Sequence, residues 1–134
     1  MPGRGDGLQI MAQVPVISES EWKVMKVLWT RAPLPAMEII QALAGTEDWH
    51  PNTVKTLLSR LHKKKALGVE KQKNLYLYRP LVSEADCVKT ESDSFLHRVF
   101  GGSVKPLLVH FVEKQHLSSD DLDELRKILR QKQK

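Results

Sequence analysis

Side chains that could read the bases of a nucleic acid are concentrated in one segment of the chain, residues 49–79. This segment contains eight Lys or Arg residues and a single acidic residue, Glu70. Near its start lie Asn52, Lys55 and Thr56. An Asn amide pairs with adenine, a Lys ammonium binds guanine, and a Thr methyl group contacts the methyl group of thymine. These residue types therefore favour direct contact with DNA.

A helix must present these side chains, and the sequence predicts one that begins at Pro51. Proline suits the first turn of a helix, because the N–H that it lacks would have no partner there. We expect the helix to fade near residues 67–68. Apolar residues recur at the spacing of one helix face, which would pack on the core: Val54, Leu57, Leu58 and Leu61.

Two short strands, 69–73 and 75–79, are predicted to form a hairpin after this helix, because apolar and polar residues alternate there. Asn74 tolerates a positive φ and is expected at the turn. Arg60, Lys63, Lys64 and Lys65 are expected to contact phosphate or a carboxylate partner. The predicted DNA contacts on the helix and the hairpin are Pro51, Asn52, Thr53, Lys55, Thr56, Ser59, Arg60, Lys63, Lys71, Lys73 and Asn74.

Two alternatives to these contacts stay open. Thr53 could cap its own helix instead of touching a base. The lysines could form a solvated surface, which is the usual role of any single lysine.

The excess positive charge of the chain lies entirely in its first part. Residues 1–82 contain 12 Lys or Arg and 7 Asp or Glu, whereas residues 83–134 contain 9 of each kind. The net charge of +5 therefore belongs to the part that includes the basic helix and hairpin. This distribution favours a polyanionic partner for the first part and a different role for the second.

Several function classes are not predicted. Cys87 is the one cysteine of the 134 residues, and the five histidines lack partners at ligand spacing, so we expect no disulfide, metal or cofactor. The sequence contains no phosphate-loop, serine-hydrolase or zinc-protease motif, so an enzyme is not expected. No apolar run reaches the ~20 residues of a membrane helix, and no signal peptide is recognised. We therefore expect a cytoplasmic protein without membrane contact.

Elements before the basic segment complete a predicted winged helix-turn-helix DNA-binding domain over residues 16–82. Residues 1–15 lack a hydrophobic period and are expected to form a disordered arm. A first helix is predicted to start with a capping box at Ser18 and Glu21 and to end before the prolines that follow.

A second helix is predicted over residues 36–44. Its expected apolar face includes Met37, Ile39, Ile40 and Leu43, and Gly45 is expected to cap its C-terminus.

Residues 83–134 are predicted to form a helical dimerisation domain. Three helices are expected, over 84–100, after Ser103 and after Ser118. About 50 residues are usually too few to fold alone, so a second copy of the chain would cover their apolar stripes. The residues expected in this contact are Leu107, Leu108, Phe111, Val112, Leu122, Leu125, Ile128 and Leu129. The predicted fold class is mainly α with a small β-hairpin wing.

Four separated segments resemble the penicillinase-repressor family. They read I-S-E-S-E-W-K-V-M-K-V-L-W from Ile17, D-W-H-P-N-T-V-K-T-L-L-S-R-L-H-K-K from Asp48, L-Y-L-Y-R-P-L-V from Leu75 and H-F-V-E-K-Q-H-L-S-S-D-D-L-D-E-L-R-K-I-L from His110. The resemblance implies a dimeric winged-helix repressor of palindromic operators in front of β-lactamase or related cell-wall genes. It places Pro51, Asn52, Thr53, Lys55 and Thr56 in the family's recognition helix and Arg60 in its arginine position.

The resemblance also implies a route of release. In several members of the family, antibiotic signalling leads to cleavage within the helix that carries V-x-F-V-E-K. The matching bond here joins His110 to Phe111, and a sensor-linked protease is the implied partner. The best-known members carry Asn before this Phe, where the present chain carries His110. Copper-responsive members carry paired Cys-x-Cys motifs, which this chain lacks.

Two hypotheses from different classes of protein follow. The first is a homodimeric, sequence-specific transcriptional repressor that loses its operator when the dimer is lost. The alternative is a winged-helix protein-interaction module without sequence-specific DNA binding, because a fold does not fix a function. A steep loss of DNA affinity with rising salt would favour the first hypothesis.

Overall fold

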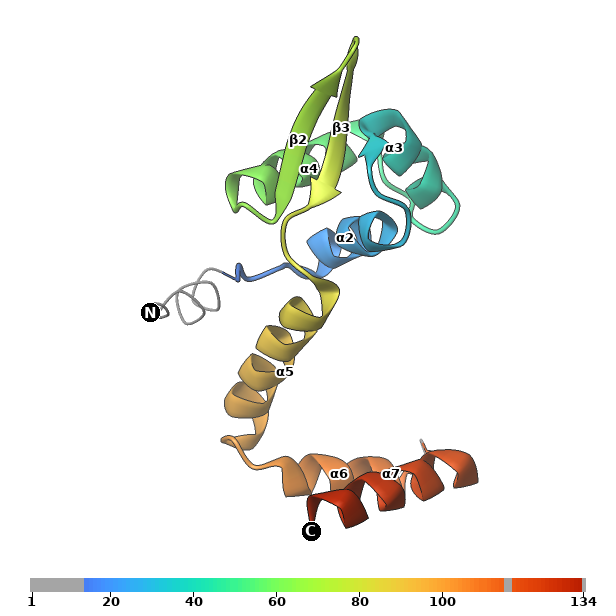
Figure 1. The fold of residues 1–134 in the computed structure, drawn as a ribbon, viewed down its shortest axis with the longest axis vertical. Coiled ribbons are helices and arrows are strands. Elements are labelled where there is room, and N and C mark those ends of the chain that lie inside the picture. Colours follow the sequence, from blue (N-terminus) through green and yellow to red (C-terminus); the bar gives the residue numbers. More distant parts are fainter. Residues whose placement is uncertain (1–13, 115–116, 134) are drawn as a thin grey trace. The chain divides into compact units, whose positions relative to one another are not determined.

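The computed structural model describes residues 14–114 and 117–133 (Figure 1). Residues 1–13, most of the predicted arm, lie outside the described residues. The elements in chain order are α2 (Glu19–Arg31), β1 (Leu34–Pro35), α3 (Ala36–Ala44), α4 (Pro51–Lys63), β2 (Leu67–Gln72), β3 (Leu75–Pro80), α5 (Glu84–Phe100), α6 (Val104–Glu113) and α7 (Ser119–Lys132).

Helix α2 begins with the predicted capping box. The hydroxyl oxygen of Ser18 accepts a hydrogen bond from the Glu21 amide at 3.2 Å, and the Glu21 carboxylate accepts one from the Ser18 amide at 2.8 Å. Two backbone donors of the first turn thereby gain partners. The helix ends at Arg31, ahead of two prolines that cannot continue it.

A third strand, β1, was not expected from the sequence. Leu34 pairs with Tyr78 and Pro35 with Leu77, so β1 joins β3 on the side opposite β2. The sheet order is β1-β3-β2, and both pairings are antiparallel. This short strand fixes the hairpin to the segment between α2 and α3.

Helix α3 has the predicted bounds but not the whole predicted apolar face. Ile39 and Leu43 are buried, whereas Met37 is 62% exposed, so the expectation that Met37 faces the core is wrong. Gly45 is the C-cap, as predicted, and its amide donates to the carbonyl of Leu43.

Helix α4 is shorter than the sequence indicated. It ends at Lys63, and Leu67 and Gly68 already belong to β2, so the expected fading near residues 67–68 is wrong. Asn74 lies in the hairpin turn, as predicted, but the residue with the positive φ is Lys73, at 56°.

One hydrophobic core joins α2, α3, α4 and the sheet. Its side chains are almost completely buried, and Cys87 of α5 closes one side of it: Ile17, Val24, Met25, Leu28, Leu34, Ile39, Leu43, Val54, Leu57, Leu58, Leu61, Ala66, Leu67 and Cys87. The core therefore holds α4 by the whole of its apolar stripe.

The chain divides into two compact units, one up to Ser92 and one from Asp93 onward. The division falls inside α5, whose bounds agree with the predicted helix over residues 84–100. Gly101 and Gly102, with φ values of 62° and 91°, end α5, and α6 and α7 follow in the second unit. Ser118 caps α7 through a capping box with Asp121. The functional boundary between residues 82 and 83 stays a prediction.

Candidate nucleic-acid interface

The start of α4 is fixed by two residues with different roles. Pro51 occupies the first turn, as predicted, and His50 is the N-cap. The Nδ1 atom of His50 accepts a hydrogen bond from the Asn52 amide at 3.0 Å. Thr53 lies inside the helix, so the alternative in which Thr53 caps α4 is wrong. The Thr53 side chain is instead exposed near the beginning of the helix.

The polar face of α4 is exposed along its whole length, opposite the buried stripe. All eight helix residues named as DNA contacts are exposed: Pro51, Asn52, Thr53, Lys55, Thr56, Ser59, Arg60 and Lys63. The helix contains no acidic residue. Thr56 donates its hydroxyl hydrogen to the carbonyl of Asn52 at 2.9 Å, so its remaining features are a methyl group and an acceptor oxygen. This face offers donors, acceptors and positive charge without local repulsion of phosphate.

Lys64 comes directly after α4 in the chain, but its side chain binds within the protein and is not part of the exposed polar face of α4. Its ammonium donates to the carboxylate of Glu21 at 2.5 Å and to the carbonyl of Val16 at 2.9 Å. The sequence predicted either phosphate or a carboxylate as the partner of Lys64, and in the structure its partner is a carboxylate.

Glu21 is a buried charge, with 1% of its surface exposed. Burial acts to raise the pKa of its carboxyl group. The hydrogen bond from Lys64, the amide of Ser18 and the positive charge of Lys64 outweigh burial, and together they hold the pKa below its ordinary value. The charged form of Glu21 is therefore the favoured one.

The turn after α4 has the geometry of a Schellman motif. The Lys65 amide donates to the His62 carbonyl at 3.0 Å, and the Ala66 amide donates to the Leu61 carbonyl at 2.9 Å. Lys65 has a φ of 67°, the left-handed conformation that this motif requires. Glycine usually occupies this position, and its absence explains why the sequence did not reveal the end of the helix.

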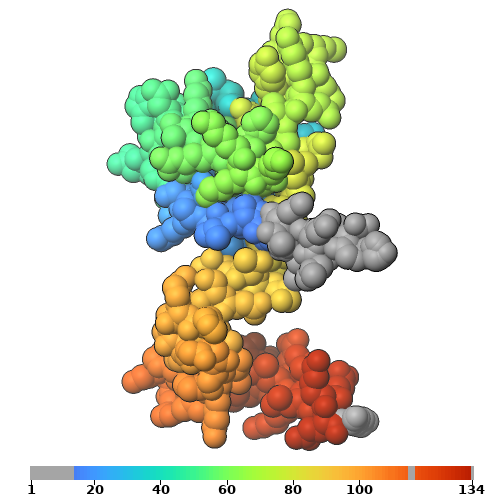
Figure 2. Space-filling model, turned by 90° about the vertical axis from the view of Figure 1, so that its left-hand side faces the viewer, coloured from blue at the N-terminus to red at the C-terminus, as the bar shows by residue number. Residues whose placement is uncertain are grey.

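The hairpin, or wing, carries the remaining predicted contacts. Lys71, Lys73 and Asn74 are all exposed at or near its tip. Lys71 pairs across the strands with Tyr76, and its ammonium lies 5.7 Å from the centre of the Tyr76 ring. Tyr76 is 55% exposed and was not among the contacts predicted from the sequence. The register of the hairpin places Tyr76 opposite Lys71, and this pairing could have indicated Tyr76 as part of the site. Figure 2 shows one face of the molecule on which the surfaces of α4 and the wing are both visible.

The residues predicted for dimerisation lie on α6 and α7. Leu107, Leu122 and Leu125 are partly buried within the unit. The other five members of the set remain substantially exposed: Leu108, Phe111, Val112, Ile128 and Leu129. His110 and Phe111, the predicted cleavage position, lie side by side in α6 with ring centroids 5.6 Å apart.

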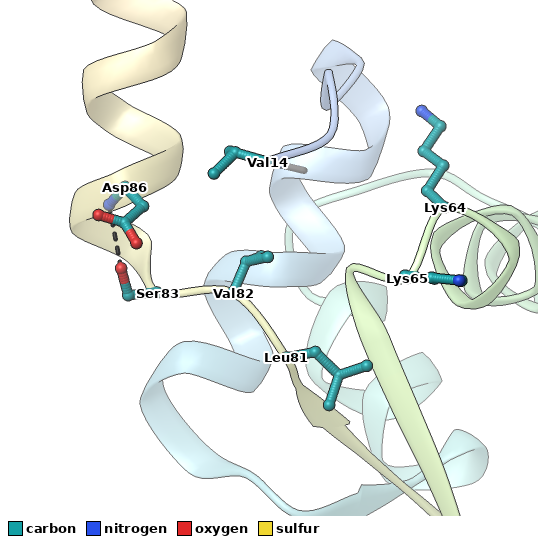
Figure 3. Close-up of a pocket in the computed structure, with 7 residues that line it drawn as sticks. All are labelled: Val14, Lys64, Lys65, Leu81, Val82, Ser83 and Asp86. Carbon is teal, nitrogen blue, oxygen red and sulfur yellow. Dashed lines mark hydrogen bonds between the residues drawn. The ribbon is translucent and has the colours of Figure 1, made fainter. Parts of the chain in front are cut away.

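A pocket of about 500 Å³ lies near the end of α4 and the start of α5. Figure 3 shows that the side chains of Lys64 and Lys65 extend away from Leu81 and Val82, which line the pocket with them. Ser83 accepts a hydrogen bond from the Asp86 amide, so its hydroxyl oxygen already has a partner in α5. The lining therefore presents no convergent set of polar groups.

Other chemistry is limited in the described part of the chain. Burial, with a smaller contribution from the charge of Asp86, raises the pKa of the Cys87 thiol, which disfavours the reactive thiolate. Within residues 14–114 and 117–133, no three His, Cys, Asp or Glu side chains gather as metal ligands. None of the helices described is long and apolar enough to cross a membrane.

The fold and the exposed basic helix define a class of protein. Three helices followed by a two-stranded wing, with α4 as the second helix of a helix-turn-helix, form a winged helix-turn-helix unit. The penicillinase-repressor family model matches residues 17–131. The chain belongs to the penicillinase-repressor family, as its sequence motifs indicated.

Individual relatives agree with this assignment. The chain is 37% identical over 119 residues to the penicillinase repressor of Bacillus licheniformis, covering 89% of this chain and 93% of that protein. It is 38% identical over 116 residues to the methicillin resistance regulatory protein MecI of Staphylococcus aureus, covering 87% and 94%.

Two solved structures are similar to the first part of the chain. They are the DNA-binding domain of the repressor BlaI and the monomeric form of Bacillus licheniformis BlaI in complex with the blaP half-operator. Each is 40% identical with a TM-score of 0.50, and the match covers 55% of this chain and 89% of the other.

Proposed function

We propose that this protein is a sequence-specific transcriptional repressor that places α4 in the major groove of operator DNA. The observation that carries the proposal is the exposed face of α4, which is polar and basic, contains no acidic residue and is held by a fully buried apolar stripe. Likeness to a BlaI structure in complex with a half-operator supports it. We assign no catalytic role to the chain and place it in the cytoplasm, where its target DNA lies.

Different residues are proposed to make different kinds of contact. Asn52, Thr53, Lys55 and Thr56 lie in the first turns of α4, where recognition helices usually meet base edges. Residues further along α4 and on the wing would bind phosphate, which supplies affinity without sequence information: Ser59, Arg60, Lys63, Lys71, Lys73 and Asn74. Pro51 sets the start of the helix.

We further propose that the repressor acts as a homodimer joined through α6 and α7. Leu108, Phe111 and Val112 are exposed and share one face of α6 by their spacing, which supports this arrangement, because contiguous exposed apolar surface marks an interaction site. A dimer with two-fold symmetry would read a palindromic operator, and repression would follow from occupation of promoter DNA. The regulated genes are proposed to be those of β-lactamase or a related cell-wall response, as the family membership suggests.

Release is proposed to follow from loss of the dimer. A single protomer binds one half-site and forfeits the gain that comes from linking two binding units. Cleavage between His110 and Phe111 by a sensor-linked protease would separate α7 from the rest of the chain. Mass spectrometry of the protein from cells exposed to a β-lactam tests this step, and an intact chain during induction would contradict it.

Salt dependence of binding tests the central proposal. The probe is a duplex selected by the full-length protein from a random pool, compared with a scrambled duplex of equal length. A repressor should prefer the selected duplex and lose affinity steeply as salt rises, with a log–log slope near −0.9 for each neutralised phosphate. Lys55→Ala should lower the preference for the selected duplex, whereas the matched variant Lys132→Ala on α7 should leave it unchanged. Weak, salt-insensitive binding would favour a protein-interaction module instead.

A further inference from the structure

We infer that the ion pair between Glu21 and Lys64 holds α4 at the orientation in which its exposed face meets DNA, so that Lys64 is a positioning residue and not a phosphate contact. This inference rests on the proposed function. Lys64 lies within a run of three lysines, residues 63–65, and would otherwise be interpreted as a phosphate contact like its neighbours.

The geometry ties the end of the recognition helix to the beginning of α2. Lys64 is the C-cap of α4, and its backbone amide donates to the carbonyls of Arg60 and His62. Its ammonium reaches the Glu21 carboxylate at 2.5 Å and the Val16 carbonyl at 2.9 Å. Two of the three ammonium hydrogens are therefore used inside the protein, and both hold Lys64 against the segment that leads into α2.

The burial of Glu21 makes this tie hard to release. Glu21 is 1% exposed, and among the residues that the structure describes Lys64 is the cation that pairs with it. Glu21 is buried whereas Lys64 is partly exposed, so withdrawing Lys64 would leave the buried charge of Glu21 without compensation, which costs more than losing an exposed pair. Any rotation of α4 that withdrew Lys64 would incur this cost, so the pair restricts how α4 can turn on α2.

Lys63 provides a matched comparison, because it immediately precedes Lys64 and is exposed on α4. The two lysines carry the same charge at nearly the same place. A phosphate contact and a positioning residue nevertheless respond differently to removal. Removal of a phosphate contact lowers affinity for all DNA and reduces the dependence of affinity on salt. Removal of a positioning residue lowers the preference for one sequence and leaves the salt dependence unchanged.

The experiment measures affinity for the selected and the scrambled duplex, as a function of salt, for full-length variants. Lys64→Met should reduce the ratio of the two affinities about tenfold, on the scale of one lost base contact, with an unchanged salt slope. Glu21→Gln should reduce the ratio in the same direction, although this variant alters no residue near DNA. The double variant should lose no more than Lys64→Met alone, because the two residues act as one unit. Lys63→Met should instead reduce the slope by roughly 0.9 and leave the ratio unchanged.

Folding is checked by circular dichroism, and binding is measured well below each unfolding midpoint, so that reduced stability alone does not change the ratio. Should Lys64→Met fail to fold, Glu21→Gln and the double variant carry the test. The inference is overturned if Lys64→Met behaves like Lys63→Met, or if Glu21→Gln tightens binding to both duplexes by freeing Lys64. A wild-type protein with no preference for the selected duplex would overturn the proposed function, and the inference with it.

Discussion

At the scale of single residues, two lysines of the basic segment adopt a backbone conformation that lysine rarely takes. Lys65 has a φ of 67° at the end of α4, and Lys73 has a φ of 56° at the tip of the wing. A residue with a Cβ pays roughly 1 kcal/mol or more in this region, which glycine does not. Positive charge is thus kept at two places where glycine would fit the backbone better.

Replacement of Lys65 by glycine should stabilise the fold. We expect Lys65→Gly to raise the free energy of unfolding by up to about 1 kcal/mol, because the left-handed conformation no longer meets a Cβ. Denaturant unfolding measures the change. As a control, Lys55→Gly, at an exposed position in the interior of α4, should lower the free energy of unfolding by about 1 kcal/mol. Equal losses in both variants would contradict the Schellman geometry at Lys65.

Glu21 should make stability depend on acid. Its carboxyl pKa in the folded state lies below the ordinary value of 4.5, because its bonds to Lys64 and Ser18 outweigh burial. The resulting stabilisation is complete above pH 4.5 and is lost as the pH falls through the folded-state pKa. The stability difference between wild type and Glu21→Gln should therefore shrink below pH 4.5. Unfolding curves across this range measure it, and a difference that grows in acid would show that burial dominates.

At the scale of elements, each helix within residues 14–114 and 117–133 was predictable from the sequence, whereas the connection after α4 and the strand β1 were not. The stripe from Val54 to Leu61 revealed α4, because a periodic apolar face is visible in a single sequence. Strand β1 was missed, since two residues cannot show an alternating pattern. Its existence depends on pairing with β3, which is distant in the chain.

The predicted end of α4 was also wrong, because the true end depends on contacts that the sequence does not show. The helix was expected to fade near residues 67–68, but Gly68 lies in β2 beside Leu81. A Cβ built there would meet the Cδ2 atom of Leu81 at 3.0 Å, so close packing accounts for this glycine. The exposed face of the candidate site was predictable from α4 alone, whereas the pairing of Lys64 with Glu21 and the contact of Lys71 with Tyr76 became visible only in the structure.

The cap of α4 gives a prediction at the same scale. His50→Ala should lower the free energy of unfolding by about 1 kcal/mol, because the Asn52 amide loses its acceptor. His50→Asn should restore most of this loss, since asparagine is a preferred N-cap residue. Thermal unfolding followed by circular dichroism compares the variants. Full stability in His50→Ala would mean that the amide of Asn52 finds another partner.

At the scale of the whole molecule, the proposed dimer depends on the apolar side chains of α6 and α7. Leu129 is 60% exposed on α7. We expect Leu129→Asp to yield folded monomers with weak operator binding. A charge buried in the apolar contact between protomers is costly, so the dimer dissociates, whereas the core of each protomer does not include Leu129 and stays intact. Sedimentation measures the mass. Gln131→Asp on the same helix should remain dimeric, and a dimeric Leu129→Asp would place the contact elsewhere.

In the proposed dimer, two copies of α4 read two halves of one duplex. Selection of duplexes from a random pool by the full-length protein, followed by sequencing, tests this claim most directly. We expect enrichment of an inverted repeat whose half-sites are centred one or more helical turns apart, each turn being roughly 10 base pairs. Enrichment of a single unrepeated motif, or of no motif at all, would contradict it.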